Sequence, residues 1–198
     1  MDVFETIRTA LAVRSYQDTP VPADVVERIV EAGRLTGSGM NRQPWHFIVV
    51  QDKAMLRRLG ELAKTGPYTA QAPLAIVVLV EQTRLGTMDG SRAIQSMLLQ
   101  AWSDGVGSNW VSPTDLTQNK SLLNIPDNMD ILAVLPFGYP AQAVGQGKKN
   151  RKPLAESTAA MAVATPEKVR VCGTFTMLQL PRNAPEGAPK PRATASGS

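Results

Sequence analysis

The sequence predicts an α+β domain in which helices flank a central mixed sheet, and three patterns support this. Residues 74–80 form an uninterrupted, largely β-branched apolar run, which is typical of a strand buried on both faces. Residues 131–137 form a second apolar run of this kind. Residues 22–33 and 89–104 carry apolar side chains at the spacing of one helix face. Strands and helices therefore alternate, as in a layered α+β domain.

Shorter elements fill the gaps between these four segments. Further helices are expected at residues 2–11, 55–64 and 115–124, and further strands at residues 47–50 and 108–111. In the first helix the apolar side chains share one face; they are Val3, Phe4, Ile7 and Leu11. Residues 36–43 contain glycines and small hydroxyl side chains without periodicity, which predicts a loop.

The composition changes near residue 157. Residues 157–198 contain five prolines and little periodicity. We therefore expect one folded domain over residues 1–156, followed by a C-terminal tail over residues 157–198 that is disordered or loosely attached.

Composition also narrows the chemistry. The chain has one histidine, His46, and one cysteine, Cys172. An intrachain disulfide and a metal site built from several His and Cys ligands are therefore excluded, and a hydrolase would depend on His46 alone. If the chain is an enzyme, we expect a cofactor to carry the chemistry.

The charge distribution argues against nucleic acid as a partner. The net charge of the whole chain is +4. The residues from Ser157 onward hold five Lys or Arg and two Asp or Glu, so the tail carries +3 and residues 1–156 only +1. The body is thus nearly neutral, and a DNA-associated role would depend on the tail alone. No apolar run approaches the roughly 20 residues of a membrane span, and no export signal is visible, so we expect a cytoplasmic protein.

Three segments carry side chains suited to a flat, phosphorylated ligand. Arg14, Lys149 and Arg151 are cations in loop-like contexts, where they can hold a phosphate by charge-assisted hydrogen bonds. Ser38 and Asn41 lie on a glycine-containing loop that can approach a ring closely. Each segment alone is more simply explained as surface charge, a basic turn or the start of a strand.

In this order and spacing, the segments resemble the nitroreductase family of FMN oxidoreductases over residues 2–156. The most specific string is Ser38-x-x-Asn41-x-Gln43-Pro44-Trp45-His46-Phe47. The other matching strings are Ala93-x-Gln95-x-Met97, Gly105-Val106-Gly107-Ser108-x-Trp110, Ile125-Pro126-Asp127, Phe137-Gly138-Tyr139-Pro140 and Arg151-Lys152-Pro153-Leu154.

The resemblance implies an entwined homodimer with two FMN sites, each built from both chains. It implies that Arg14 contacts the FMN phosphate, with Lys149 and Arg151 as a second phosphate-binding pair. It also implies that Ser38 and Asn41 reach the flavin bound to the partner chain.

The resemblance places residues 111–113 against the flavin ring. These are Val111, Ser112 and Pro113, and the backbone N–H of Ser112 is expected near flavin N5. The implied reaction is ping-pong: hydride passes from NAD(P)H to N5 and then to a small electron-poor acceptor, such as a nitroaromatic or a quinone. No side chain need act as a nucleophile, and no metal is needed.

The sequence departs from the family pattern at the phosphate-binding segment. Family members usually have Arg-Arg-Ser where this chain has Ala10, Leu11 and Ala12, so one phosphate-binding arginine and a serine are missing. In addition, Pro113 stands where glycine is common, and the tail after Glu156 resembles nothing in the family. A degenerate family member that binds flavin without catalysis is therefore the alternative.

Overall fold

The protein is described by a computed structural model covering residues 1–111, 117–144 and 149–158. The chain divides into two compact units, residues 1–149 and residues 150–198. The second unit contains the short helix α6 (Leu154–Ser157). Most of the tail expected from the sequence, residues 159–198, lies outside the described residues, and so the domain boundary stays a prediction.

The first unit is built on a four-stranded sheet with the strand order β1-β2-β4-β3. The strands are β1 (Trp45–Val50), β2 (Leu74–Glu81), β3 (Gly107–Ser108) and β4 (Met129–Gly138). All three strand pairs are antiparallel. Among the described residues, parallel pairing occurs at an isolated bridge between Ala12 and Ser108. The predicted α+β class is confirmed.

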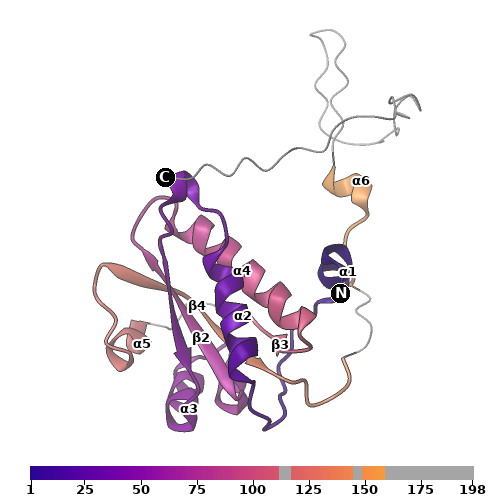
Figure 1. Ribbon diagram of the computed structural model, residues 1–198. Helices are drawn as coiled ribbons and strands as arrows, with labels where there is room; N and C mark the ends of the chain where they lie inside the picture. Colours follow the sequence, from indigo (N-terminus) through magenta and orange to yellow (C-terminus); the bar gives the residue numbers. More distant parts are fainter. Residues whose placement is uncertain (112–116, 145–148, 159–198) are drawn as a thin grey trace, which may run out of the picture. The chain divides into compact units, whose positions relative to one another are not determined.

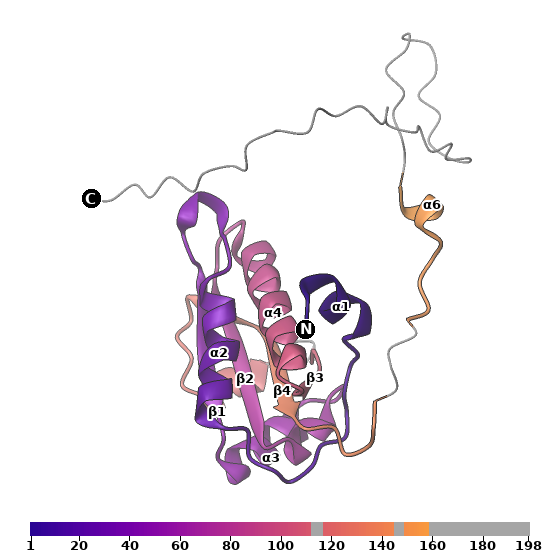
Figure 2. The same ribbon diagram turned by 45° about the vertical axis from the view of Figure 1, so that its right-hand side comes forward.

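Helices cover both faces of this sheet (Figures 1 and 2). The helices of this unit are α1 (Val3–Thr9), α2 (Ala23–Arg34), α3 (Lys53–Leu62), α4 (Gly86–Ser103) and α5 (Thr117–Leu122). Two 3-10 turns, η1 (Gly39–Asn41) and η2 (Pro67–Gln71), complete the unit. Helices α2 and α4 pack on one face, and α3 packs on the other.

Strand β2 is buried on both faces, as its apolar run predicts. Leu74, Ile76 and Val78 pack in the cluster that contains α2 and α4. The alternate residues Ala75 and Val77, with Leu79, pack in the cluster that contains α3. Since successive side chains of a strand point to opposite faces, this one strand joins the two halves of the core.

Helix α1 presents its apolar side chains to solvent. Val3 and Phe4 are 74% and 73% exposed, and Ile7 is also exposed. The buried residues of α1 are instead Thr6 and Thr9. The apolar face that the sequence predicts for this helix is therefore present, but no core of the described residues covers it.

Within the described part of the chain, no helix is both long enough and apolar enough to cross a membrane.

Candidate functional site

Arg14 projects from a segment that is fixed on both sides. The Val13 N–H donates to the Ser108 carbonyl at 2.9 Å. The buried Tyr16 hydroxyl donates to the Val13 carbonyl at 2.7 Å. Because Val13 is buried, Arg14 faces outward, and its side chain makes no hydrogen bond or ion pair with another described residue. The chain thus offers an unpaired guanidinium on a rigid support.

Close packing joins this segment to β3. A Cβ atom on Gly107 would lie 2.5 Å from Val13 Cγ2, which is far inside van der Waals contact. Glycine at position 107 therefore lets the backbone of the Arg14 segment lie directly against β3.

The residues after β3 bring a buried amide to the same region. Val111 exchanges backbone hydrogen bonds with Val134 of β4, at 3.0 and 3.2 Å. The buried Asn109 accepts from the Trp110 N–H through Oδ1 at 2.8 Å, whereas its Nδ2 has no hydrogen-bond partner in the described structure. Ser112 and Pro113, which are expected beside the flavin, lie outside the described residues.

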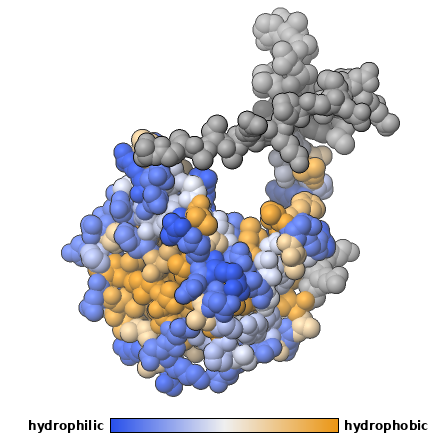
Figure 3. Space-filling view, viewed as in Figure 1, coloured by the Kyte–Doolittle hydropathy of each residue, from blue (hydrophilic) through white to orange (hydrophobic). Residues whose placement is uncertain are grey.

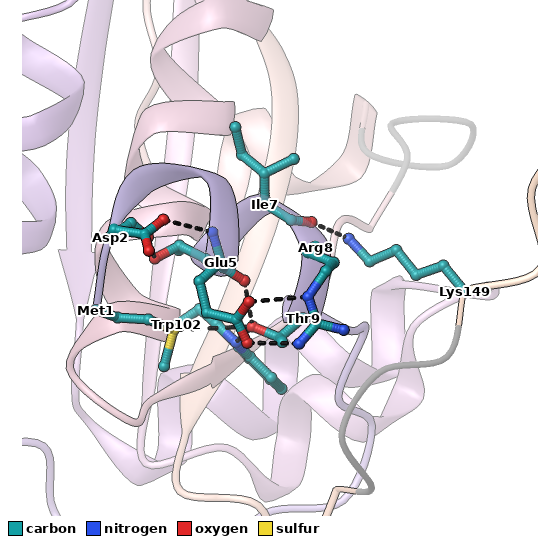
Figure 4. A network of polar contacts seen from close by, with 9 residues as sticks. Met1, Asp2, Glu5, Ile7, Arg8, Thr9, Trp102 and Lys149 are labelled. Carbon is teal, nitrogen blue, oxygen red and sulfur yellow. Dashed lines mark hydrogen bonds and ion pairs between the residues drawn. The ribbon is translucent and has the colours of Figure 1, made fainter. Parts of the chain in front are cut away.

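Lys149 lies beside helix α1. Its Nζ donates to the carbonyl of Ile7, in the turn that leads toward Arg14 (Figure 4). The same helix is held to the end of α4, because Trp102 Nε1 donates to Thr9 Oγ1 at 3.0 Å. Arg151 is exposed and belongs to the second unit, where it donates to the Asn150 carbonyl at 3.1 Å.

The loop of Ser38 and Asn41 has a defined and unusual conformation. Met40, Asn41 and Gln43 have φ values of 54°, 54° and 50°. Non-glycine residues rarely adopt this left-handed conformation, which costs on the order of 1–3 kcal/mol each and persists where the surroundings enforce it. Here Ser38 Oγ accepts from the Gln43 N–H at 2.8 Å. The exposed Asn41 side chain makes no hydrogen bond to another described residue.

Two contacts place this loop and the Arg14 segment at opposite ends of α4. Asp89, in the first turn of the helix, accepts from the Gly39 N–H at 3.0 Å. Trp102, in the last turn, donates to Thr9 of α1. At 1.5 Å per residue, Asp89 and Trp102 are separated by about 20 Å along the helix axis. One chain therefore holds Arg14 beside β3 and Lys149 beside α1, whereas the loop of Ser38 and Asn41 is anchored at the other end of α4.

The residues of the Arg14 region fit a phosphorylated flavin. Arg14 is an unpaired cation suited to the phosphate, and the Asn109 amide is a buried donor beside the strip expected to face the ring. Ala10 and Ala12 offer no side-chain donor, so the phosphate would have fewer partners here than the family pattern provides. Asn109 is not among the site residues predicted from the sequence, although a polar amide within a predicted strand could have indicated it.

Comparison with known proteins identifies the family of this fold. The family model "Nitroreductase family" matches residues 7–92 and 80–139. A Methanothermobacter thermautotrophicus protein, named as a candidate NADH dehydrogenase/NAD(P)H nitroreductase, is 34% identical over 154 residues, covering 73% of this chain and 81% of that protein. An FMN reductase [NAD(P)H] of Bacillus subtilis is 26% identical over 180 residues, covering 77% of this chain and 70% of that protein.

Solved structures agree with these sequence matches. A Parabacteroides distasonis protein, also named as a candidate NADH dehydrogenase/NAD(P)H nitroreductase, superimposes with a TM-score of 0.72 at 31% identity. The match covers 76% of this chain and 93% of that one. Family model, relative and fold therefore coincide, and the chain belongs to the nitroreductase family.

Proposed function

We propose that this protein is an FMN-dependent oxidoreductase, which passes hydride from NAD(P)H to a small electron-poor acceptor such as a nitroaromatic or a quinone. The observation that carries the proposal is the backbone pairing of the Arg14 segment with Ser108, just before the strip at Val111, together with the contact of Lys149 with α1. The names of the relatives, which include NAD(P)H nitroreductase and FMN reductase, support the same assignment.

Each residue of the region has a proposed role in binding or orientation. Arg14 and Lys149 bind the ribityl phosphate. Asn109 and the backbone after Val111 orient the ring. FMN supplies the two-electron chemistry, so the protein needs no side-chain nucleophile, in keeping with its single histidine and single cysteine. The nicotinamide and the acceptor use the same pocket in turn, which gives ping-pong kinetics.

The proposed active form is a homodimer. The loop of Ser38 and Asn41 is anchored at Asp89 and helix α1 at Trp102, about 20 Å apart along α4, which favours a flavin site that takes the loop and Arg14 from different chains. Exposed apolar surface suited to such a partner is present on α1. A further apolar area appears on the side of the molecule where β1 lies (Figure 3). Val49 of β1 is also an exposed apolar residue.

Flavin titration of the apo-protein tests the proposal. FMN should bind more tightly than FAD, because Arg14 and its neighbours suit a terminal phosphate. The FMN-loaded protein should then oxidise NADH or NADPH in the presence of a quinone or nitroarene panel. Equal or tighter binding of FAD would contradict the cofactor assignment. Tight FMN binding without oxidation of either nicotinamide would favour the non-catalytic alternative.

A further inference from the structure

A polar pocket lies beside the loop of Ser38 and Asn41, at the beginning of α4. It has a volume of about 220 Å³, and its polar lining comprises Arg42, Thr83, Arg84 and Asp89. Leu85 contributes to its apolar wall. A Cβ atom on Gly39 would lie 2.6 Å from Leu85 Cδ1, so the loop rests directly on this wall.

The charges of this pocket are unbalanced. Asp89 is engaged, since its carboxylate accepts from the Gly39 N–H and lies 3.8 Å from an Arg92 guanidinium nitrogen. The side chains of Arg42 and Arg84 make no hydrogen bond or ion pair with another described residue. The pocket therefore presents two uncompensated guanidinium groups.

Three exposed arginines of the described helices have acidic partners three or four residues away. These pairs are Arg8–Glu5, Arg28–Asp24 and Arg34–Glu31, with nitrogen–oxygen distances of 2.6–2.8 Å. The two pocket arginines differ from these surface pairs because they face a cavity and lack a carboxylate of their own.

The lining matches a terminal phosphate monoester. Guanidinium groups bind phosphate oxygens through paired, charge-assisted hydrogen bonds. A phosphate monoester carries about −1.5 to −2 charge at pH 7, which two arginines neutralise. The Thr83 hydroxyl, which makes no side-chain hydrogen bond to another described residue, supplies a further donor.

We propose that this pocket binds the 2′-phosphate of NADPH and gives the enzyme a preference for NADPH over NADH. The proposal rests on the function proposed above, in which the loop of Ser38 and Asn41 reaches the flavin of the partner chain. The proposal places the adenosine end of a nicotinamide that stacks on this flavin near the same loop. Met40 and Arg42 are on that loop and line the pocket, so the pocket lies within reach of that end.

Two measurements test this assignment with the variants Arg42→Ala, Arg84→Ala and their combination. The first is the KM of the FMN-loaded enzyme for NADPH and for NADH. The second is calorimetric binding of adenosine 2′,5′-bisphosphate and of AMP, which needs no turnover. Arg57→Ala is the matched control, because Arg57 is an exposed arginine of α3 outside the pocket.

The wild-type protein should prefer NADPH and bind the bisphosphate more tightly than AMP. Each single variant should raise the KM for NADPH about tenfold and change the KM for NADH less than about twofold, as expected for loss of one charge-assisted contact to the extra phosphate. The double variant should bind the bisphosphate and AMP equally well. Arg57→Ala should behave as the wild type.

Three results would overturn the proposal. One is equal use of NADH and NADPH by the wild type, and another is an unchanged nicotinamide preference in the double variant. The third is loss of FMN binding in the double variant, which would assign the pocket to the flavin phosphate. A protein that oxidises neither nicotinamide would contradict the proposed function instead, and the calorimetric comparison would still decide whether the pocket recognises the 2′-phosphate.

Discussion

The position of the Arg14 guanidinium is determined by the contacts of its neighbours in the chain. Val13 is tied to Ser108, and Tyr16 is buried and bonded to Val13. Burial raises the pKa of the Tyr16 hydroxyl, and the neighbouring Tyr68 adds to the rise. The hydroxyl therefore stays protonated as a donor, and its contribution to stability is lost only when the pH rises above the unfolded value of about 10.

Removal of the Arg14 charge should weaken FMN binding. Arg14→Ala removes a hydrogen bond to a charged group, worth about 1.5–3 kcal/mol, so the Kd for FMN should rise about tenfold or more. Fluorescence titration of the apo-protein measures this, with Arg57→Ala as the control. An unchanged Kd would remove Arg14 from the phosphate site.

Restoration of the family's usual residues should have the opposite effect. Ala10→Arg with Ala12→Ser adds two donors beside Arg14, and both positions have side-chain exposure that can accommodate the change. FMN should then bind more tightly by up to a few kcal/mol, less wherever the site is open to water. If the same titration gives identical affinities for the parent and the double variant, this segment does not touch the phosphate.

A hydrogen bond attaches the loop at η1 to the beginning of helix α4. Three left-handed residues give the loop its shape, and the bond from the Gly39 N–H to Asp89 attaches it to the first turn of the helix. The buried Asp89 carboxylate thus holds a conformation that the backbone alone disfavours.

Loss of this acceptor should destabilise the protein and disorder the loop. Asp89→Leu leaves the Gly39 N–H without its partner, at a cost of about 1–3 kcal/mol in the free energy of unfolding. Asp89→Asn keeps an acceptor oxygen and should cost less. Urea denaturation of the two variants compares them directly, and equal losses would show that the hydrogen bond does not stabilise the loop.

The regular elements were predictable from the sequence, whereas the features that shape the site were not. The apolar run of β2 and the helical spacing of α4 determine their burial locally, and both predictions are confirmed. The turn η2 was missed, because a single 3-10 turn has no periodicity to detect. The left-handed conformation of the loop residues depends on tertiary contacts such as the one with Asp89. The sequence motif therefore identified Ser38 and Asn41 as candidate residues but could not predict the conformation of their loop.

In the described structure, the apolar side chains of helix α1 are exposed to solvent. The sequence predicted an amphipathic helix, but the burial of Thr6 and Thr9 in place of Val3 and Phe4 depends on how the helix packs. In the proposed dimer, a second chain supplies the missing cover.

Charged residues on this face should therefore weaken the dimer. Phe4→Glu with Ile7→Glu should shift the protein toward monomer in sedimentation velocity experiments at micromolar concentration, because desolvating two carboxylates opposes association. Arg57→Glu is the control, since it adds an acidic residue on an exposed face of α3. A double variant that sediments like the wild type would exclude α1 from the interface.

In the proposed dimer, each flavin site takes Arg14 from one chain and Asn41 from the other, and mixed dimers distinguish this arrangement from a site built by a single chain. Arg14→Ala and Asn41→Ala chains are co-expressed with different affinity tags, and the heterodimer is purified through both tags. One of its sites then carries both defects and the other carries neither, so about one FMN should bind per heterodimer with wild-type affinity. Each homodimer should bind FMN weakly. A heterodimer that binds FMN as weakly as both homodimers would contradict the shared site.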